Sequence, residues 1–218
     1  EFIVNRTRGN PLLAKSLVAH WVETEGLTPH ASGYQVSEGA RGTAVIERVW
    51  SIFLNKLLEQ FEDHQAAFEG LTLIAAMGKQ VDLEEWESAC QVRGITAPMG
   101  LVDALEETGH AERRGITLML VRAPFFIEIR ERAKLTDAWK LAHNACAASV
   151  LKEGRNGVPV NERRGAHFLQ AGNLARAIPQ FLTSVAELMR QSAYERALEV
   201  AEQTLDLLSL GDEEAQDR

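Results

Sequence analysis

Histidine, cysteine and carboxylate side chains are the groups of this chain that could bind a metal or catalyse a reaction, and their spacing decides whether they do. The six histidines lack the short intervals of zinc ligands: His20, His30, His64, His110, His143 and His167. Cys90 and Cys146 stand alone, which indicates neither a disulfide framework nor a zinc site. No phosphate-binding, dinucleotide-binding, zinc-protease or serine-hydrolase motif is present. The sequence therefore predicts no metal site and no catalytic centre within this chain.

The composition is that of a globular protein with one or two domains: 218 residues, 45% of them hydrophobic and 25% charged. The 31 acidic residues outnumber the 23 basic ones, and the net charge of −8 disfavours binding to nucleic acid or to an anionic membrane. No apolar run approaches the roughly 18 residues of a membrane span, and no signal peptide is recognisable, so we expect a cytoplasmic setting. Because the chain begins Glu1-Phe2 without Met and ends in acidic residues, we expect an excerpt of a longer protein.

The N-terminal part predicts two helices joined by a loop. Asn10 as N-cap, Pro11 at the first helical position and Gly26 just past the end indicate a helix over 11–25. Its apolar stripe consists of Leu13, Leu17, Val18 and Trp21. Residues 27–43 contain three glycines and no apolar period, which predicts a loop, and regular apolar spacing then predicts a helix over 44–62.

The middle of the chain predicts a winged helix-turn-helix. Short helices over 66–77, 83–90 and 98–108 are followed by two short strands within 110–121, which turn at Arg114-Gly115. Asp82 is suited to cap the second helix, with Glu85 three residues on completing a capping box. Three helices followed by a hairpin is the order of elements in a winged helix.

A winged helix invites a DNA-binding hypothesis, and the charge of the segment tests it. Between Val81 and Gly109, which includes the helix that would enter the major groove, seven acids face a single base, Arg93. The segment therefore carries a charge of −6, whereas contacts with phosphates need positive charge. The sequence favours a winged helix that packs against protein.

The last third predicts helices only, over 124–133, 134–153, 161–171, 174–191 and 193–209. The segments that start at Leu174 and Tyr194 echo each other at an interval shorter than the about 34 residues of a tetratricopeptide repeat, so they mark successive helices. Pro179 should kink or interrupt its helix. The smallest residues, Ala177 and Ala197, are expected where helices touch, with a shared core of Phe181, Leu182, Leu188 and Leu198.

Several segments together resemble the STAND nucleoside triphosphatases, a class of multidomain signal-transduction ATPases that includes maltose-activator-like regulators. Arg6-Thr-Arg-Gly-Asn-Pro-Leu-Leu13 is similar to their Gly-x-Pro motif. Residues 68–78 with 81–83, and then 101–109, look like the first and third segments of their winged helix. Residues 122–132 resemble the segment that follows the wing, and the helices after residue 160 look like a tetratricopeptide sensor.

This resemblance implies a mainly α fold with a small β-wing and three parts: a helical ATPase subdomain (1–62), a winged helix (63–133), and a helical linker with the start of a tetratricopeptide-like superhelix (134–218). It implies that Gly9, Asn10, Pro11 and Arg122 contact ATP or ADP, which is held with Mg²⁺ mainly by a P-loop domain absent from this chain. Many relatives have a histidine near the β-phosphate where this chain has Ala123, which puts phosphate sensing in doubt.

The function implied by the resemblance is regulatory. The chain would couple the nucleotide state of the P-loop domain to a protein or small-molecule inducer bound by the helical repeats, with self-association as a further possibility. No catalytic centre is expected here, although the parent protein would be an ATPase. The alternatives are a winged-helix transcriptional regulator that binds DNA and a non-catalytic protein-interaction scaffold.

Overall fold

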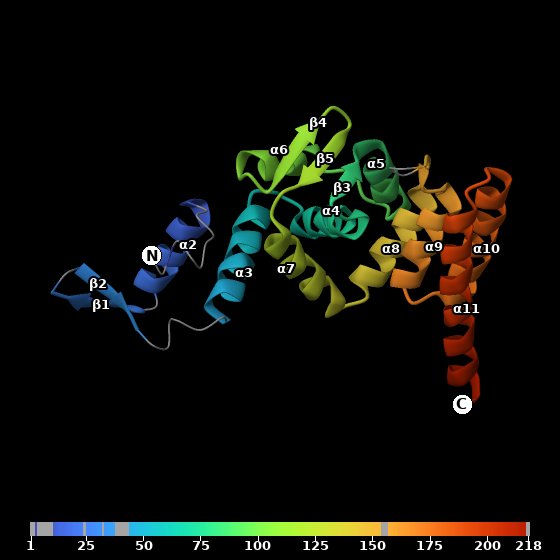
Figure 1. Ribbon diagram of the computed structural model, residues 1–218. Coiled ribbons are helices and arrows are strands. Elements are labelled where there is room, and N and C mark those ends of the chain that lie inside the picture. Colours follow the sequence, from blue (N-terminus) through green and yellow to red (C-terminus); the bar gives the residue numbers. More distant parts are fainter. Residues whose placement is uncertain are drawn as a thin grey trace. The chain divides into compact units, whose positions relative to one another are not determined.

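The structure, a computed structural model, describes residues 3, 11–23, 25–31, 33–37, 44–153 and 157–216, with side chains omitted at 12, 13, 16, 20, 23, 44–49 and 210–216. It is mainly helical with small antiparallel strands, which confirms the expected fold class (Figure 1). The chain divides into two compact units, residues 1–62 and 63–218. The functional labels given to the three expected domains stay predictions.

The first unit contains α2 (Pro11–Glu23), β1 (Leu27–His30), β2 (Gly33–Val36) and α3 (Ala44–Leu58). Leu17 and Trp21 on α2 are buried, and Val18, Leu27 and Val36 pack around them. The helix expected over 11–25 is therefore confirmed, with its end two residues earlier.

The loop expected over 27–43 is partly wrong, because 27–36 forms a β-hairpin. Leu27 pairs with Val36 and His30 pairs with Gly33, whose φ of 132° is open to glycine. Most residues of both strands are exposed, so the segment lacks the alternation of apolar and polar residues that would have revealed it.

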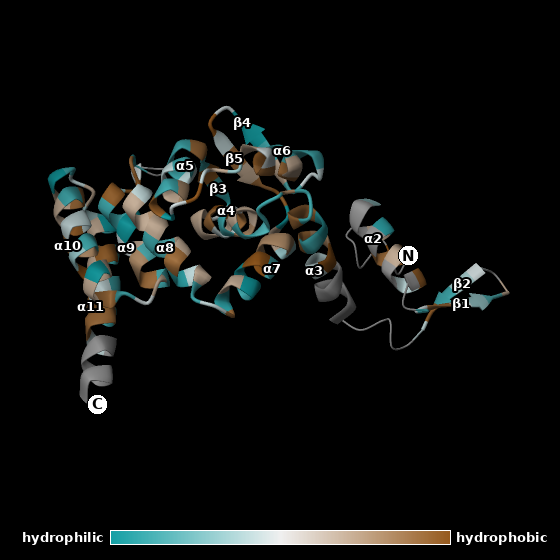
Figure 2. Ribbon diagram, turned by 180° about the vertical axis from the view of Figure 1, so that it is seen from behind, coloured by the Kyte–Doolittle hydropathy of each residue, from teal (hydrophilic) through white to brown (hydrophobic). Residues whose placement is uncertain are grey.

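The second unit begins with elements in the order expected of a winged helix, and we use that name for residues 64–120. Its elements are α4 (His64–Met77), β3 (Gln80–Asp82), α5 (Leu83–Val92), α6 (Met99–Glu107), β4 (Ala111–Arg114) and β5 (Thr117–Leu120). The strands lie in the order β3-β5-β4, and Val81 pairs with Leu118. Strand β3 was not expected from the sequence, since it has only three residues. Strand β4 is hydrophilic (Figure 2), whereas Trp86 of α5 is fully buried.

Five helices complete the second unit: α7 (Ala123–Lys134), α8 (Ala138–Ser149), α9 (Val160–Gln170), α10 (Leu174–Arg190) and α11 (Tyr194–Gln216). Helix α8 contacts α4 and α5 of the winged helix on one side and α9 on the other. Helices α9, α10 and α11 then pack in sequence, each against the next. Helix α8 thus lies between the winged helix and helices α9–α11, which we call the helical repeats (Figure 1).

The packing of α10 against α11 confirms part of the expected core and corrects the rest. Ala177 and Ala197 are buried, together with Phe181 and Leu188. Leu182 and Leu198 are exposed, and their assignment to the core was wrong. Each follows a buried residue directly, and one helical step turns a side chain by about 100° out of the interface. Helix α10 also runs through Pro179 without the interruption considered above.

Helices α9 and α10 approach each other closely at Gly165. Gly165 is buried on α9, and a Cβ atom built on it would lie 2.8 Å from Cε1 of the Phe181 ring. Real Cβ atoms do not approach an aromatic carbon so closely, so the ring occupies the space that only glycine leaves. The fit of α9 on α10 therefore depends on the absence of a side chain at this position.

We expect Gly165→Ala to lower the free energy of unfolding by about 1–3 kcal/mol, because the added methyl group overpacks the contact with Phe181. Chemical denaturation measures the change. The control is Phe181→Leu, which removes part of the ring: combined with Gly165→Ala, it should cost less than the sum of the two single changes. Additive losses would contradict the contact.

Candidate functional site

The residues expected to contact nucleotide lie in both units. Gly9 and Asn10 fall outside the described residues. Pro11 is the exposed first residue of α2 in the first unit, and Arg122 precedes α7 in the second. Their roles in binding nucleotide stay predictions.

Arg122 is held against the end of the winged-helix core. Its Nε donates a hydrogen bond to the carbonyl oxygen of Gly109 at 2.7 Å, which joins the start of α7 to the turn after α6. The neighbouring His110 is buried and its ring lies 4.3 Å from that of Phe125. Burial and the nearby Arg122 charge lower the pKa of His110 to about 4. Arg122 thus has a structural role that the sequence did not indicate.

A groove of about 410 Å³ opens beside Ala123, the exposed first residue of α7. Its walls include Leu120, Phe126 and Trp139, and Lys79 and Arg130 add positive charge. Arg130 also pairs with Glu131 at 2.8 Å, whereas no ion pair of Lys79 is found within the described residues. The groove combines an apolar wall with cations in a chain whose net charge is negative.

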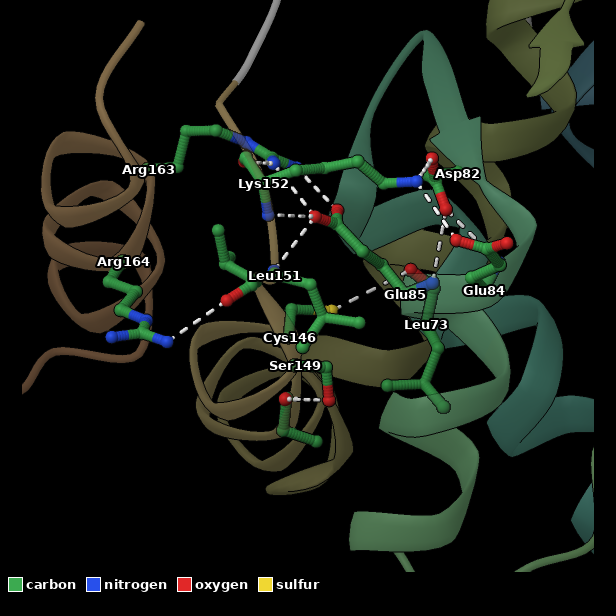
Figure 3. A network of polar contacts seen from close by, with 12 residues as sticks. Leu73, Asp82, Glu84, Glu85, Cys146, Ser149, Leu151, Lys152, Arg163 and Arg164 are labelled. Carbon is green, nitrogen blue, oxygen red and sulfur yellow. Dashed lines mark hydrogen bonds and ion pairs between the residues drawn. The ribbon is translucent and has the colours of Figure 1, made fainter. Parts of the chain in front are cut away.

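A cluster of polar contacts joins α5 to α9 and to the segment between α8 and α9, and we call it the Glu85 junction (Figure 3). Glu85 projects from α5, and only 3% of its side chain is exposed. Arg163 of α9 donates a hydrogen bond to each carboxylate oxygen, from Nη1 to Oε1 at 2.9 Å and from Nη2 to Oε2 at 2.6 Å. The backbone N–H groups of Leu151 and Lys152 donate to Oε1 at 3.0 and 3.4 Å. One carboxylate therefore ties together α5, α9 and the segment between α8 and α9.

A second ring of contacts surrounds Glu85. Lys152 Nζ lies 2.9 Å from Asp82 Oδ2 and 3.0 Å from Glu84 Oε2, so it bridges the start of α5 to the same segment. Arg163 Nη1 also donates to the carbonyl oxygen of Lys152 at 2.6 Å, and Arg164 donates to that of Val150 at 3.0 Å. Both arginines thus fix the backbone that follows α8, where helical hydrogen bonding has ended.

Hydrogen bonding decides the charge of Glu85. Burial by itself would raise the pKa of Glu85, but the hydrogen bonds from Arg163, Leu151 and Lys152 and the Arg163 charge outweigh burial and hold that pKa below its usual range. Glu85 is therefore ionised at neutral pH, and the junction is a buried ion pair whose oxygens are well supplied with donors.

Two histidines lie close to the junction, at the contact of α8 with α9. His143 Nδ1 and His167 Nδ1 are 2.9 Å apart, so one ring donates a hydrogen bond to the other. Burial, followed by the influence of His167, lowers the pKa of His143 to about 3. Burial and the Arg163 charge, partly offset by Glu85, lower the pKa of His167 to about 4. Both rings are neutral at physiological pH.

Among the described residues no group of three or more His, Cys, Asp or Glu side chains could hold a metal ion. Cys90 and Cys146 are buried, and burial raises the pKa of both thiols, that of Cys90 to about 12, so neither is a ready nucleophile. In the same part of the chain, no helix is long and apolar enough to span a membrane. The contacts of the Glu85 junction hold α5, α9 and the segment between α8 and α9 in register.

Sequence reasoning found one residue of the junction but gave it the wrong role. Asp82 caps α5 as expected, since its Oδ1 accepts from the N–H groups of Glu84 and Glu85. The expected capping box is wrong in its second half, because the Glu85 carboxylate is turned toward α9 and Arg163. Glu84 and Glu85 both lie between the core residues Leu83 and Trp86, so this position did not indicate which of the two would be buried. Arg163 gave no signal, because it lies 78 residues away in the sequence.

Comparison with protein-family models, with curated proteins and with solved structures found no match to this chain.

Removing the Glu85 charge should destabilise the second unit. We expect Glu85→Gln to lower the free energy of unfolding by about 2–4 kcal/mol, because Arg163 then keeps a largely buried charge without its counterion. The matched control is Glu84→Gln, which removes an exposed acid from the same helix and should cost about 0–1 kcal/mol. Equal losses in urea denaturation of the two variants would contradict the special role of Glu85.

The buried histidines predict a loss of stability in mild acid. An unfolded histidine takes up a proton near pH 6.5, whereas His143 and His167 stay neutral down to about pH 3 and 4, so stability should fall as the pH drops from about 6.5 to 4. His143→Gln should reduce the slope of stability against pH in this interval. The exposed His64 provides the control, since His64→Gln should leave the slope unchanged. Loss of stability confined to more acidic pH, where the carboxyl of Glu85 takes up a proton in the unfolded chain before it does so in the folded one, would argue that the histidine pair contributes nothing.

Proposed function

We propose that this chain is the regulatory segment of a signal-transduction ATPase of the STAND class. In this role the winged helix receives the nucleotide state of a P-loop domain and passes it to the helical repeats, which sense a protein or small-molecule inducer. Pro11 and its neighbours border the nucleotide from the first unit. The observation that carries the proposal is the Glu85 junction, because a relay needs a defined mechanical link between the part that receives a signal and the part that responds.

The contacts of the junction suit such a relay. Glu85 comes from the winged helix, and its donors come from the segment after α8 and from α9. Breaking these contacts would expose a buried carboxylate and a guanidinium group at once, so intermediate positions are costly. A joint of this kind favours discrete arrangements over gradual bending, which is the property that a switch requires.

The groove beside Ala123 supports a contact with a nucleotide-bearing domain. Many members of the class have a histidine at the position of Ala123, and this chain has only a methyl group there. The cations Lys79 and Arg130 line the space that is left. We propose that they supply the positive charge toward phosphate that the missing histidine would provide.

The DNA-binding alternative finds little support in the charges of the winged helix. Helix α6 stands where such folds place the helix that enters the major groove, and its exposed charged residues are Asp103 and Glu107. Arg113 and Arg114 at the tip of the wing are basic, but Glu112 pairs with Arg114 at 2.9 Å. Acidic side chains on the reading helix would repel the phosphates of a duplex.

The test uses the natural protein with its nucleotide-binding domain. Hydrogen exchange in α9–α11 should differ between the ADP-bound and ATP-bound protein, because the junction passes the change on. Glu85→Gln should abolish this difference while nucleotide binding itself is retained. The control Glu84→Gln should keep the difference.

Two results would contradict the proposal. One is a natural sequence without a phosphate-binding G-x-x-x-x-G-K-[ST] loop. The other is exchange in α9–α11 that responds to nucleotide equally in wild type and in Glu85→Gln, since the signal would then bypass the junction.

A further inference from the structure

Helix α11 carries an apolar row that the described residues of its unit leave exposed. Tyr194 and Leu198 are each 60% exposed, Leu205 is 63% exposed and Leu208 is 40% exposed. Ala201 lies between them and is half-buried. We call these five residues the α11 seam. Figure 2 shows apolar and polar residues alternating along this helix.

The spacing of the seam is that of a helix-packing surface. Its residues follow one another at intervals of four, three, four and three, which is the a/d pattern of a heptad. The residue before each of the last four seam positions faces the interior: Ala197, Val200 and Thr204 are buried and Leu207 is half-buried. This inner row packs against α10, so α11 has a wider apolar face than its contact with α10 uses.

An acidic row borders the seam on its other side. Each of the first four seam residues is followed directly by an exposed acid: Glu195, Glu199, Glu202 and Asp206. Arg196 pairs with Glu199 and with Glu162 of α9. Within the described part of the chain, no ion pair is found for the other three acids. The open edge of the seam is therefore negatively charged.

We propose that the α11 seam is a docking surface for an amphipathic helix of a partner protein that carries lysine or arginine along one edge of its apolar face. The apolar residues of the partner helix would pack between the side chains of the seam, as knobs into holes, and the acidic row would pair with the basic edge of the partner. Charge favours such a partner over a second copy of this chain. Two antiparallel α11 helices packed seam to seam would bring acidic row against acidic row.

The inference rests on the proposed function in one respect, since it names the class of partner that the helical repeats sense. Binding at the seam is nevertheless measurable without nucleotide. Failure of binding therefore counts against the seam alone, and failure of the nucleotide response counts against the relay alone.

The probe is a synthetic helical peptide of three heptads with leucine at a and d and lysine at the flanking positions, and its partner peptide has glutamate in place of lysine. We expect the lysine peptide to bind the chain with a dissociation constant about tenfold or more below that of the glutamate peptide. The double variant Leu198→Ser/Leu205→Ser should weaken binding of the lysine peptide about tenfold or more. The matched control, Leu135→Ser/Leu141→Ser, removes two exposed leucines elsewhere and should bind as wild type.

A second pair of variants separates the acidic row from net charge. Glu195→Lys/Glu202→Lys and Asp103→Lys/Glu107→Lys change the charge of the chain equally, but only the first pair lies beside the seam. Weaker binding in the first variant alone supports the proposal. Equal weakening in both variants would contradict it, because the peptide would then bind only through general attraction between opposite charges. Because all these positions are exposed, helical circular dichroism should stay unchanged.

Three other outcomes would overturn the proposal. The first is equal peptide binding in the seam variant and its leucine control. The second is tight binding of the glutamate peptide. The third is a dimer in sedimentation equilibrium that Leu198→Ser dissociates, which would show that a second copy occupies the seam.

Discussion

The second unit of this protein depends on one buried ion pair. Glu85 is the first-turn residue of a short helix in the winged helix, and Arg163 belongs to the helical repeats. A carboxylate that is almost fully buried is costly unless every oxygen is hydrogen-bonded, and here four donors from two segments satisfy it. This requirement favours the observed position of α9, which brings all four donors to the carboxylate at once.

The rest of the unit is arranged around that constraint. Helix α8 lies between the winged helix and α9, and it must end where the backbone N–H groups of Leu151 and Lys152 can reach Glu85. Beyond α9, the absence of a side chain at Gly165 lets α10 approach, and the small residues Ala177 and Ala197 let α11 follow. Local packing thus continues outward from the Glu85 junction through α9 and α10 to α11, which is consistent with the proposed relay.

Much of this fold could be predicted from the sequence because its signals are local. Apolar periodicity and helix-terminal residues located the helices of the winged helix, and Arg114-Gly115 marked the turn of the wing. The hairpin at 27–36 was missed because its strands are exposed on most positions, and β3 was missed because three residues carry no period. Leu182 and Leu198 were wrongly assigned to the core because each lies next to a buried residue. The sequence does not indicate which of two adjacent apolar rows faces the neighbouring helix.

The candidate site was much less predictable, for a physical reason. Glu85 and Arg163 are far apart in the sequence, and each is an ordinary residue for a helix surface until the fold brings them together. The histidine pair is similar, because His143 and His167 become partners only through the packing of α8 on α9. Contacts of this kind form only in the tertiary structure, whereas caps, turns and amphipathic stripes depend on residues close together in the sequence and can be recognised there.

Native-state hydrogen exchange at increasing denaturant tests the central claim most directly, namely that the Glu85 junction makes the winged helix and α9 a single cooperative unit. The buried amides of α5 and α9 should then open with the same free energy and the same dependence on denaturant. If the amides of α9 open at much lower free energy while those of α5 stay protected, the two parts separate freely and the junction does not couple them.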